Sequence, residues 1–335
     1  MLKLSYIIPC HNGEKFISKC LDNVYSQDIG EDEFEIICVN DCSTDNTREV
    51  ILNYGKNHSN LRVIDHTENK RQGGAKNTGI RVAKGEYIVF IDQDDFINHL
   101  KTSELYDCIS ENALDIAGFR FMIEKSPNNW LEMGSLESRS EIMSGQEFCE
   151  KYSKSDVSFA PWSYWYRREY LLQLDRWFAE EVMWEDADWV AQAVFFASKM
   201  QFFPIPVYKW AFNGLSISHT VDYRTIADMI LMGYRKFIFG IEIEKLSPIF
   251  SKQMKTDGVQ NSQIVAKVWK LKRKHINLFY NKISITNKTP DFSNSMSGYN
   301  KFLFRYPKTV KFFALFLSPL VRSLLFIKNF KKKLT

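Results

Sequence analysis

The sequence predicts an α/β fold in which helices flank a mostly parallel sheet. The first 120 residues alternate between short apolar segments and segments whose apolar residues have helical spacing. Apolar strands that alternate with helices are typical of βαβ units, whose strands run parallel. The expected strands are LSYIIP (4–9), EFEIICVN (33–40), NLRVID (60–65) and YIVFID (87–92).

Three helices are expected between these strands, in KFISKCLDNVYSQ (15–27), STDNTREVILNYG (43–55) and GGAKNTGIRVAKG (73–85). Ser43 or Thr44 is the predicted N-cap of the second helix, because hydroxyl side chains accept hydrogen bonds from free N–H groups at helix starts. Gly55 and Gly85 are the predicted ends of the second and third helices, since glycine readily terminates a helix.

The chain is 45% hydrophobic and 25% charged over 335 residues, which indicates a globular protein and excludes a disordered one. Its six cysteines form no CxxC pair and predict free thiols in a reducing compartment. The apolar N-terminal segment is too short and too soon interrupted for a secretory signal. Residues 121–222 are less regular, 223–283 are expected to be mainly helical, and 284–300 are polar like a loop.

The C-terminal segment 301–335 carries nine Lys or Arg and no acidic residue. The rest of the chain has 35 basic and 40 acidic residues, so the positive charge is local and argues against a nucleic-acid-binding protein. The apolar stretch 312–327 is interrupted by Pro319 and Arg322, and it is shorter than the roughly 20 residues of a membrane span. Two interpretations remain open: an amphipathic segment on an anionic membrane, or a helix packed on the main domain.

Three carboxylates follow the fourth predicted strand, at Asp92, Asp94 and Asp95. Carboxylates at one strand end repel one another unless a cation joins them. Mg²⁺ typically binds one or two protein carboxylates together with substrate phosphates, so this segment is a candidate metal–diphosphate site. The alternative is that Asp94 and Asp95 cap a helix in NHLKTSELYDCI (98–109). Asp41 follows the second predicted strand, and ligands of parallel sheets bind beyond such strand ends.

Five motifs lie in the order IIPCHNGEKFISKCLDNVYSQ, VNDCSTDNT, NKRQGGAKNTG, IDQDD and WEDADW. In order and spacing the sequence resembles glycosyltransferase family 2, the inverting GT-A-type nucleotide-sugar transferases, over residues 3–220. The resemblance implies a Rossmann-like GT-A catalytic domain at 1–222, with a nucleotide-sugar half at about 1–120 and an acceptor half at about 121–222. A helical extension at 223–300 and the basic tail at 301–335 would follow it.

The resemblance implies a nucleotide-binding set of Pro9, His11, Asn12, Asp41, Lys76 and Asp92. Asp41 matches the aspartate that recognises uracil or thymine, although Asn40 stands where many members have a first aspartate. His11 replaces the usual tyrosine that lines the nucleotide. Lys76 replaces the usual arginine. The lysine keeps the positive charge but lacks the forked pair of donors with which arginine binds bidentately.

The resemblance also implies that Asp94, with Asp92, holds Mn²⁺ or Mg²⁺, and that Asp186 is the catalytic base. Glu185 would position Asp186 or the acceptor. The chemistry agrees, because a metal stabilises charge on a leaving diphosphate and a carboxylate can take the proton of the attacking hydroxyl. Direct attack with one base inverts the sugar carbon.

Aromatic residues and a histidine outside these motifs are further candidates. Trp162, Trp165 and Tyr166 either stack on an acceptor sugar or pack in the core. His219 either contacts a phosphate or metal or is structural. Asp188 is expected to point away from Asp186, because the two are only two positions apart on a helix.

The expected function is transfer of one hexose-type sugar from a nucleotide-sugar, preferably UDP-linked, to a glycan or lipid-linked acceptor. The resemblance implies bacterial surface polysaccharide synthesis at the cytoplasmic face of the plasma membrane, with the enzyme peripherally bound. A processive synthase is disfavoured because the sequence shows no set of membrane-spanning helices. One alternative is a sugar nucleotidyltransferase, although this sequence lacks the Gly-rich phosphate loop expected of that class. The other is a catalytically silent family member that acts as a membrane-bound assembly partner.

Overall fold

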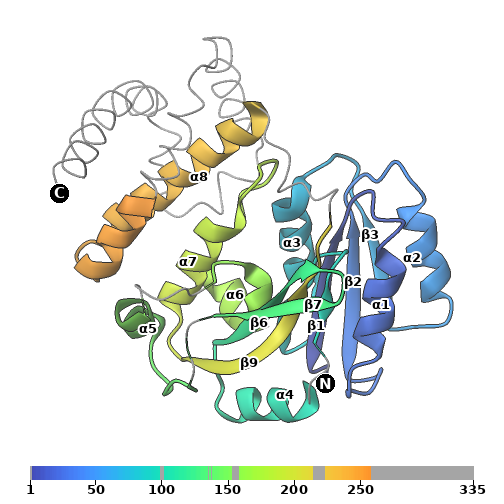
Figure 1. Cartoon of the computed structure of the whole chain (residues 1–335), viewed down its shortest axis with the longest axis horizontal. Helices are drawn as coiled ribbons and strands as arrows, with labels where there is room; N and C mark the ends of the chain where they lie inside the picture. The colour runs from blue at the N-terminus through green and yellow to red at the C-terminus, as the bar shows by residue number, and fades with distance from the viewer. Residues whose placement is uncertain are drawn as a thin grey trace. The chain divides into compact units, whose positions relative to one another are not determined.

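The computed structural model describes residues 2–98, 102–134, 136, 138–152, 158–213 and 223–257. The chain divides into two compact units, residues 1–219 and 220–335 (Figure 1). All six cysteines lie in described parts of the first unit and are free thiols. No helix among the described residues is both long and apolar enough to cross a membrane. The basic tail, residues 301–335, lies outside the described residues.

The first unit is built on a mixed sheet, which within the described residues has the order β3-β2-β1-β4-β8-β6-β9-β5, with β7 paired to β6. The strands are β1 (Leu4–Cys10), β2 (Phe34–Asn40), β3 (Leu61–Asp65), β4 (Tyr87–Phe90), β5 (Phe96–Ile97), β6 (Ile116–Ser126), β7 (Asn129–Met133), β8 (Tyr164–Arg167) and β9 (Met200–Trp210). β3, β2, β1 and β4 are mutually parallel, as predicted. β8 pairs antiparallel with both β4 and β6, and β9 pairs parallel with β6.

The helices include the three that were predicted between the first four strands. The labelled helices of the described residues are α1 (Ile17–Tyr25), α2 (Thr47–Gly55), α3 (Arg71–Val82), α4 (Thr102–Glu111), α5 (Gly145–Tyr152), α6 (Arg168–Leu174), α7 (Asp186–Phe196) and, in the second unit, α8 (Tyr223–Glu242). The first three are the predicted ones. Residues 248–257 are also helical. The helical prediction for 223–283 therefore agrees with the described part, and 258–283 lie outside it.

The two faces of β1 explain how the sheet is covered. Tyr6 and Ile8 face the core shared with α1 and α2. Ile7 points to the opposite face, toward α3, because successive side chains of a strand alternate. Gly79 on α3 lies so close that a Cβ there would be 2.4 Å from Ile7 Cγ2. This close approach brings α3, and with it Lys76, against the parallel strands (Figure 1).

Two predicted helix boundaries were wrong. Neither Ser43 nor Thr44 caps α2, which begins at Thr47. The Asp45 carboxylate accepts the Thr47 N–H instead, while the Ser43 hydroxyl accepts the N–H of Asn12 in the neighbouring loop. α3 ends at Val82, before Gly85. Gly85 instead allows a close approach to the main chain at Leu4, because a Cβ there would lie 2.4 Å from the Leu4 carbonyl carbon.

The helix-capping alternative for the aspartates after β4 is excluded. The short strand β5 directly follows Asp94 and Asp95, so neither residue precedes a helix start, and α4 is described over Thr102–Glu111. The Thr102 N–H is bound by the carboxylate of Asp28 at 2.5 Å. The acidic segment therefore ends a strand and leads into another strand, as a ligand-binding loop at a sheet edge would.

Candidate active site

The loop after β4 is held in place by its most buried aspartate. Asp95 is buried and accepts hydrogen bonds from the Tyr208 hydroxyl at 2.7 Å and from the Ala211 N–H at 2.8 Å. The same hydroxyl accepts the N–H of Asp92 at 3.0 Å. Burial, with the nearby Asp92 and Asp94 charges, raises the pKa of Asp95. Asp95 therefore anchors the loop, while Asp92 and Asp94 are only partly buried.

Trp162 supports this anchor. Its ring stacks on Tyr208 with centroids 4.3 Å apart and planes 8° from parallel. Trp165 and Tyr166 lie on β8 and are buried, so these two pack in the core. Trp162 is partly buried and packs against that core. The candidate His219 lies outside the described residues.

Gln93 connects the acidic loop to the end of β1. Its amide nitrogen donates to the His11 carbonyl at 2.9 Å, and its amide oxygen accepts the His11 N–H at 3.1 Å. Gly13 leaves room for this pairing, since a Cβ there would be 2.1 Å from Gln93 Oε1. Sequence reasoning missed Gln93; the only signals were an amide between two motif aspartates and a glycine in the partner loop.

The predicted nucleotide-binding residues at the ends of β1 and β2 lie close together. Pro9 is in buried β1 and His11 follows it, with Nδ1 at 2.7 Å from the Asp41 carbonyl oxygen. Asn12 has a left-handed backbone, with φ of 50°, and its Oδ1 accepts the Thr44 N–H at 2.8 Å. The two loops are thus connected through main-chain and side-chain hydrogen bonds beside Asp41.

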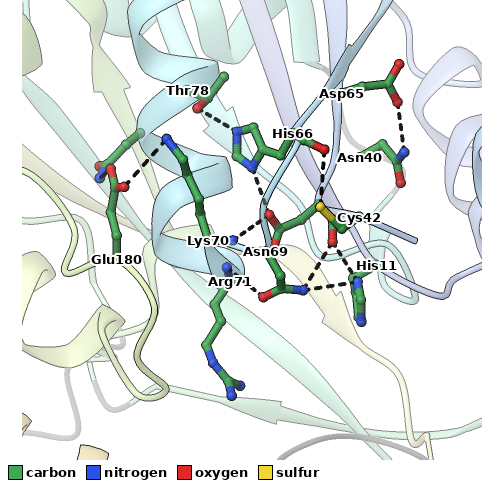
Figure 2. A network of polar contacts seen from close by, with 12 residues as sticks. His11, Asn40, Cys42, Asp65, His66, Asn69, Lys70, Arg71, Thr78 and Glu180 are labelled. Carbon is green, nitrogen blue, oxygen red and sulfur yellow. Dashed lines mark hydrogen bonds and ion pairs between the residues drawn. The ribbon is translucent and has the colours of Figure 1, made fainter. Parts of the chain in front are cut away.

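Asp41 itself belongs to a polar network with His66, Asn69 and Lys70, and these three partners are labelled in Figure 2. Its Oδ1 lies 2.8 Å from His66 Nδ1 and accepts the Lys70 N–H, also at 2.8 Å. The Asn69 side chain donates to its carbonyl oxygen at 3.2 Å. Sequence reasoning missed His66, whose only signal was its place directly after the third predicted strand.

Lys76 and Glu185 form a buried ion pair, with Nζ 3.0 Å from Oε1. The pair joins α3 to the start of α7, across 109 positions of sequence. Burial opposes the charge of Lys76, but the Glu185, Asp92 and Asp186 carboxylates raise its pKa, so the lysine stays charged. The side-chain amide of Asn77, the next residue, donates to the Phe178 carbonyl and accepts the Phe178 N–H. The structure thus gives Lys76, one of the predicted nucleotide-binding residues, a protein partner.

Asp186 is the first residue of α7 and is partly exposed. Its Oδ1 accepts the Ala187 N–H at 2.7 Å. Asp188 is buried and binds the Gln192 side chain at 3.1 Å, so it is directed elsewhere, as predicted. Trp184, just before the pair, is exposed and has a φ of 66°, which is unusual for a bulky residue.

The two acidic motifs lie within electrostatic reach of each other. Burial, together with Asp94, Glu185 and Asp186, raises the pKa of Asp92 to about 6, although Lys76 opposes this effect. One buried lysine thus faces several carboxylates, and this excess negative charge suits a cation. No group of three or more His, Cys, Asp or Glu in the described part of the chain is arranged to hold a metal. A pair such as Asp92 and Asp94 nevertheless suits Mg²⁺, which takes its other ligands from phosphates and water.

The family model for glycosyl transferase family 2 matches residues 5–174. The chain therefore belongs to this family, and the predicted membership is confirmed. Staphylococcus aureus TarS 1–349 in complex with UDP-GlcNAc has a similar structure, with a TM-score of 0.65, 20% identity, and coverage of 92% of this chain and 88% of that one. This likeness confirms the predicted GT-A-type fold.

Curated relatives are named as glycosyltransferases. The uncharacterized glycosyltransferase EpsJ of Bacillus subtilis is 29% identical over 67% of this chain and 65% of its own length. The poly(ribitol-phosphate) β-glucosyltransferase of Bacillus spizizenii is 41% identical over 34% of this chain, but only 18% of its own length is matched. The chain thus spans less than two thirds of these relatives' lengths.

The buried ion pair leads to a prediction about stability. Lys76→Met should lower the free energy of unfolding by about 3–5 kcal/mol, because it leaves a carboxylate buried without its partner. Urea unfolding followed by tryptophan fluorescence measures this loss. The double variant Lys76→Met/Glu185→Gln, which removes the stranded charge, should recover much of it. A Lys76→Met protein as stable as the wild type would show that the pair contributes nothing.

Proposed function

We propose that the protein is an inverting, metal-dependent, non-processive glycosyltransferase that moves one hexose-type sugar from a UDP-linked donor to a glycan or lipid-linked acceptor. The observation that carries this proposal is the buried ion pair of Lys76 with Glu185, which Asp92 and Asp186 also approach, with Asp94 beside Asp92. Family membership supports sugar transfer as the reaction class. The uracil preference rests on Asp41, and the acceptor class on the relatives.

In the proposed reaction each group has a separate task. Asp41 binds the base, and Asp92 and Asp94 would hold Mn²⁺ or Mg²⁺, which would stabilise negative charge on the leaving diphosphate. Asp186 accepts the proton of the acceptor hydroxyl as that oxygen attacks the anomeric carbon. Glu185 remains paired with Lys76 and so orients the start of α7. A single base with direct attack accounts for inversion.

Two relatives support the choice of donor and acceptor. The solved TarS complex contains UDP-GlcNAc, which supports a UDP-linked donor. The names of the Bacillus spizizenii and Staphylococcus aureus relatives specify sugar transfer involving poly(ribitol-phosphate). This supports a polymer acceptor of the kind used in surface polysaccharide synthesis.

A donor screen tests the proposal. Purified protein is incubated with UDP-, GDP- and dTDP-sugars and Mn²⁺ or Mg²⁺, and release of the nucleoside diphosphate is followed. We expect metal-dependent release of UDP, and NMR of the product should show the inverted anomer. Retention of configuration would contradict the mechanism. No release from any donor would favour the silent assembly partner, and synthesis of nucleotide-sugar from a nucleoside triphosphate would favour the nucleotidyltransferase.

We further propose that residues 301–335 bind the enzyme peripherally to the cytoplasmic face of the plasma membrane. Basic residues near an anionic surface contribute about 1 kcal/mol each, and exposed apolar side chains add burial at the headgroups. Full-length protein should sediment with anionic vesicles and be partly released by high salt. A truncation after Asn300 should remain soluble and stay off vesicles. Indifference of the full-length protein to anionic vesicles at low salt, or unfolding of the truncation, would contradict this proposal.

A further inference from the structure

His66 is fixed on both sides of its ring. Nδ1 lies 2.8 Å from Asp41 Oδ1, and Nε2 lies 2.9 Å from the Thr78 hydroxyl on α3 (Figure 2). The His66 side chain is only 7% exposed. Its main chain is held too, because the Cys42 thiol donates to the His66 carbonyl at 3.1 Å. A neutral ring in this position donates from Nδ1 to the carboxylate and accepts the threonine proton at Nε2.

The two carboxylate oxygens of Asp41 consequently differ. Oδ1 receives two donors, His66 Nδ1 and the Lys70 N–H. Oδ2 accepts no hydrogen bond from any residue that the structure describes. Asp41 therefore offers an incoming base one uncommitted acceptor oxygen, although a free carboxylate would offer two.

We propose that His66 is a positioning residue for Asp41 that makes the site selective for uracil-type bases over guanine. Uracil and thymine present a single imide N–H, which one oxygen satisfies. Guanine presents two adjacent donors, N1–H and the N2 amino group, which pair with both oxygens of a free carboxylate. With Oδ1 occupied, the second guanine donor is left unpaired, and a site rejects a ligand whose polar groups it strands. This inference rests on the proposed nucleotide-sugar function.

The test measures UDP and GDP affinity by calorimetry with Mn²⁺ in the full-length protein. His66→Phe should weaken UDP binding about tenfold or more, the scale of a hydrogen bond to a charged group, and should narrow the preference for UDP over GDP. His66→Asn, which keeps a donor near the Nδ1 position, should stay close to the wild type. Thr78→Val removes the hydrogen bond to Nε2 on the far side of the ring. It should reduce UDP affinity and the preference for UDP over GDP, but less than His66→Phe does.

Two controls separate positioning from general damage. Arg48→Gln removes an exposed ion pair with Asp65, the residue next to His66, and should leave both affinities unchanged. In an Asp41→Ala background, adding His66→Phe should cost no further UDP affinity. An equal loss in both backgrounds would show that His66 is merely structural.

Other results would also overturn the inference. They are wild-type UDP affinity and selectivity in His66→Phe, an equal loss in His66→Phe and His66→Asn, or a wild-type preference for GDP. If His66→Phe fails to fold, Thr78→Val decides, and an unchanged selectivity there counts against the inference. A wild-type protein that binds neither nucleotide would refute the proposed function itself, a result distinct from failure of the histidine variants alone.

Discussion

Asp186→Asn should lower turnover about 100-fold or more while donor affinity stays close to that of the wild type. The amide cannot take the proton of the acceptor hydroxyl, but it has the same shape and its oxygen can still accept the Ala187 N–H. The helix start should therefore be preserved. Steady-state release of the nucleoside diphosphate in the presence of acceptor gives the turnover, and calorimetry with the donor gives the affinity.

A matched control lies in the loop that precedes α7. Glu181 is exposed and precedes the motif, so Glu181→Gln makes the same carboxylate-to-amide change without touching the proposed base. It should transfer sugar at the wild-type rate. If Asp186→Asn also transfers at nearly that rate, another group takes the proton and the assignment is wrong.

Asp94→Ala should abolish Mn²⁺-dependent UDP binding with the fold intact. Altering a residue that only orients a metal ligand typically costs about 10- to 100-fold in metal affinity, and loss of a direct ligand should cost more. The loop should persist, because Asp95 and Tyr208 hold it independently of Asp94. Calorimetry with UDP, with and without Mn²⁺, measures the effect, and circular dichroism checks the fold.

Asp107→Ala is the control for this variant, since it removes an exposed carboxylate from α4. Its Mn²⁺-dependent UDP affinity should equal that of the wild type. Without metal, Asp94→Ala and the wild type should bind UDP equally weakly. If Asp94→Ala keeps the metal-dependent gain in affinity, Asp94 is not a ligand.

The local pattern of the sequence was sufficient to predict the parallel half of the sheet. The strands β1 to β4 are short apolar runs separated by segments of helical spacing, and both periodicities depend on neighbours only a few positions apart. β8 was not placed, because nothing in YWYR indicates that it pairs antiparallel with β4 and β6. Strand pairing over such distances depends on packing that no local window contains.

The candidate site shows the same division. The acidic motifs and Asp41 were found from sequence, because a strand end or a family motif marks each of them. Three contacts were decided only by tertiary structure: Lys76 with Glu185, Gln93 with the His11 main chain, and His66 with Asp41. Each joins residues from separate strands or helices, and a lysine or an amide has no pattern that names its partner. These contacts exist because the fold brings polar groups together away from water, where each must find a partner.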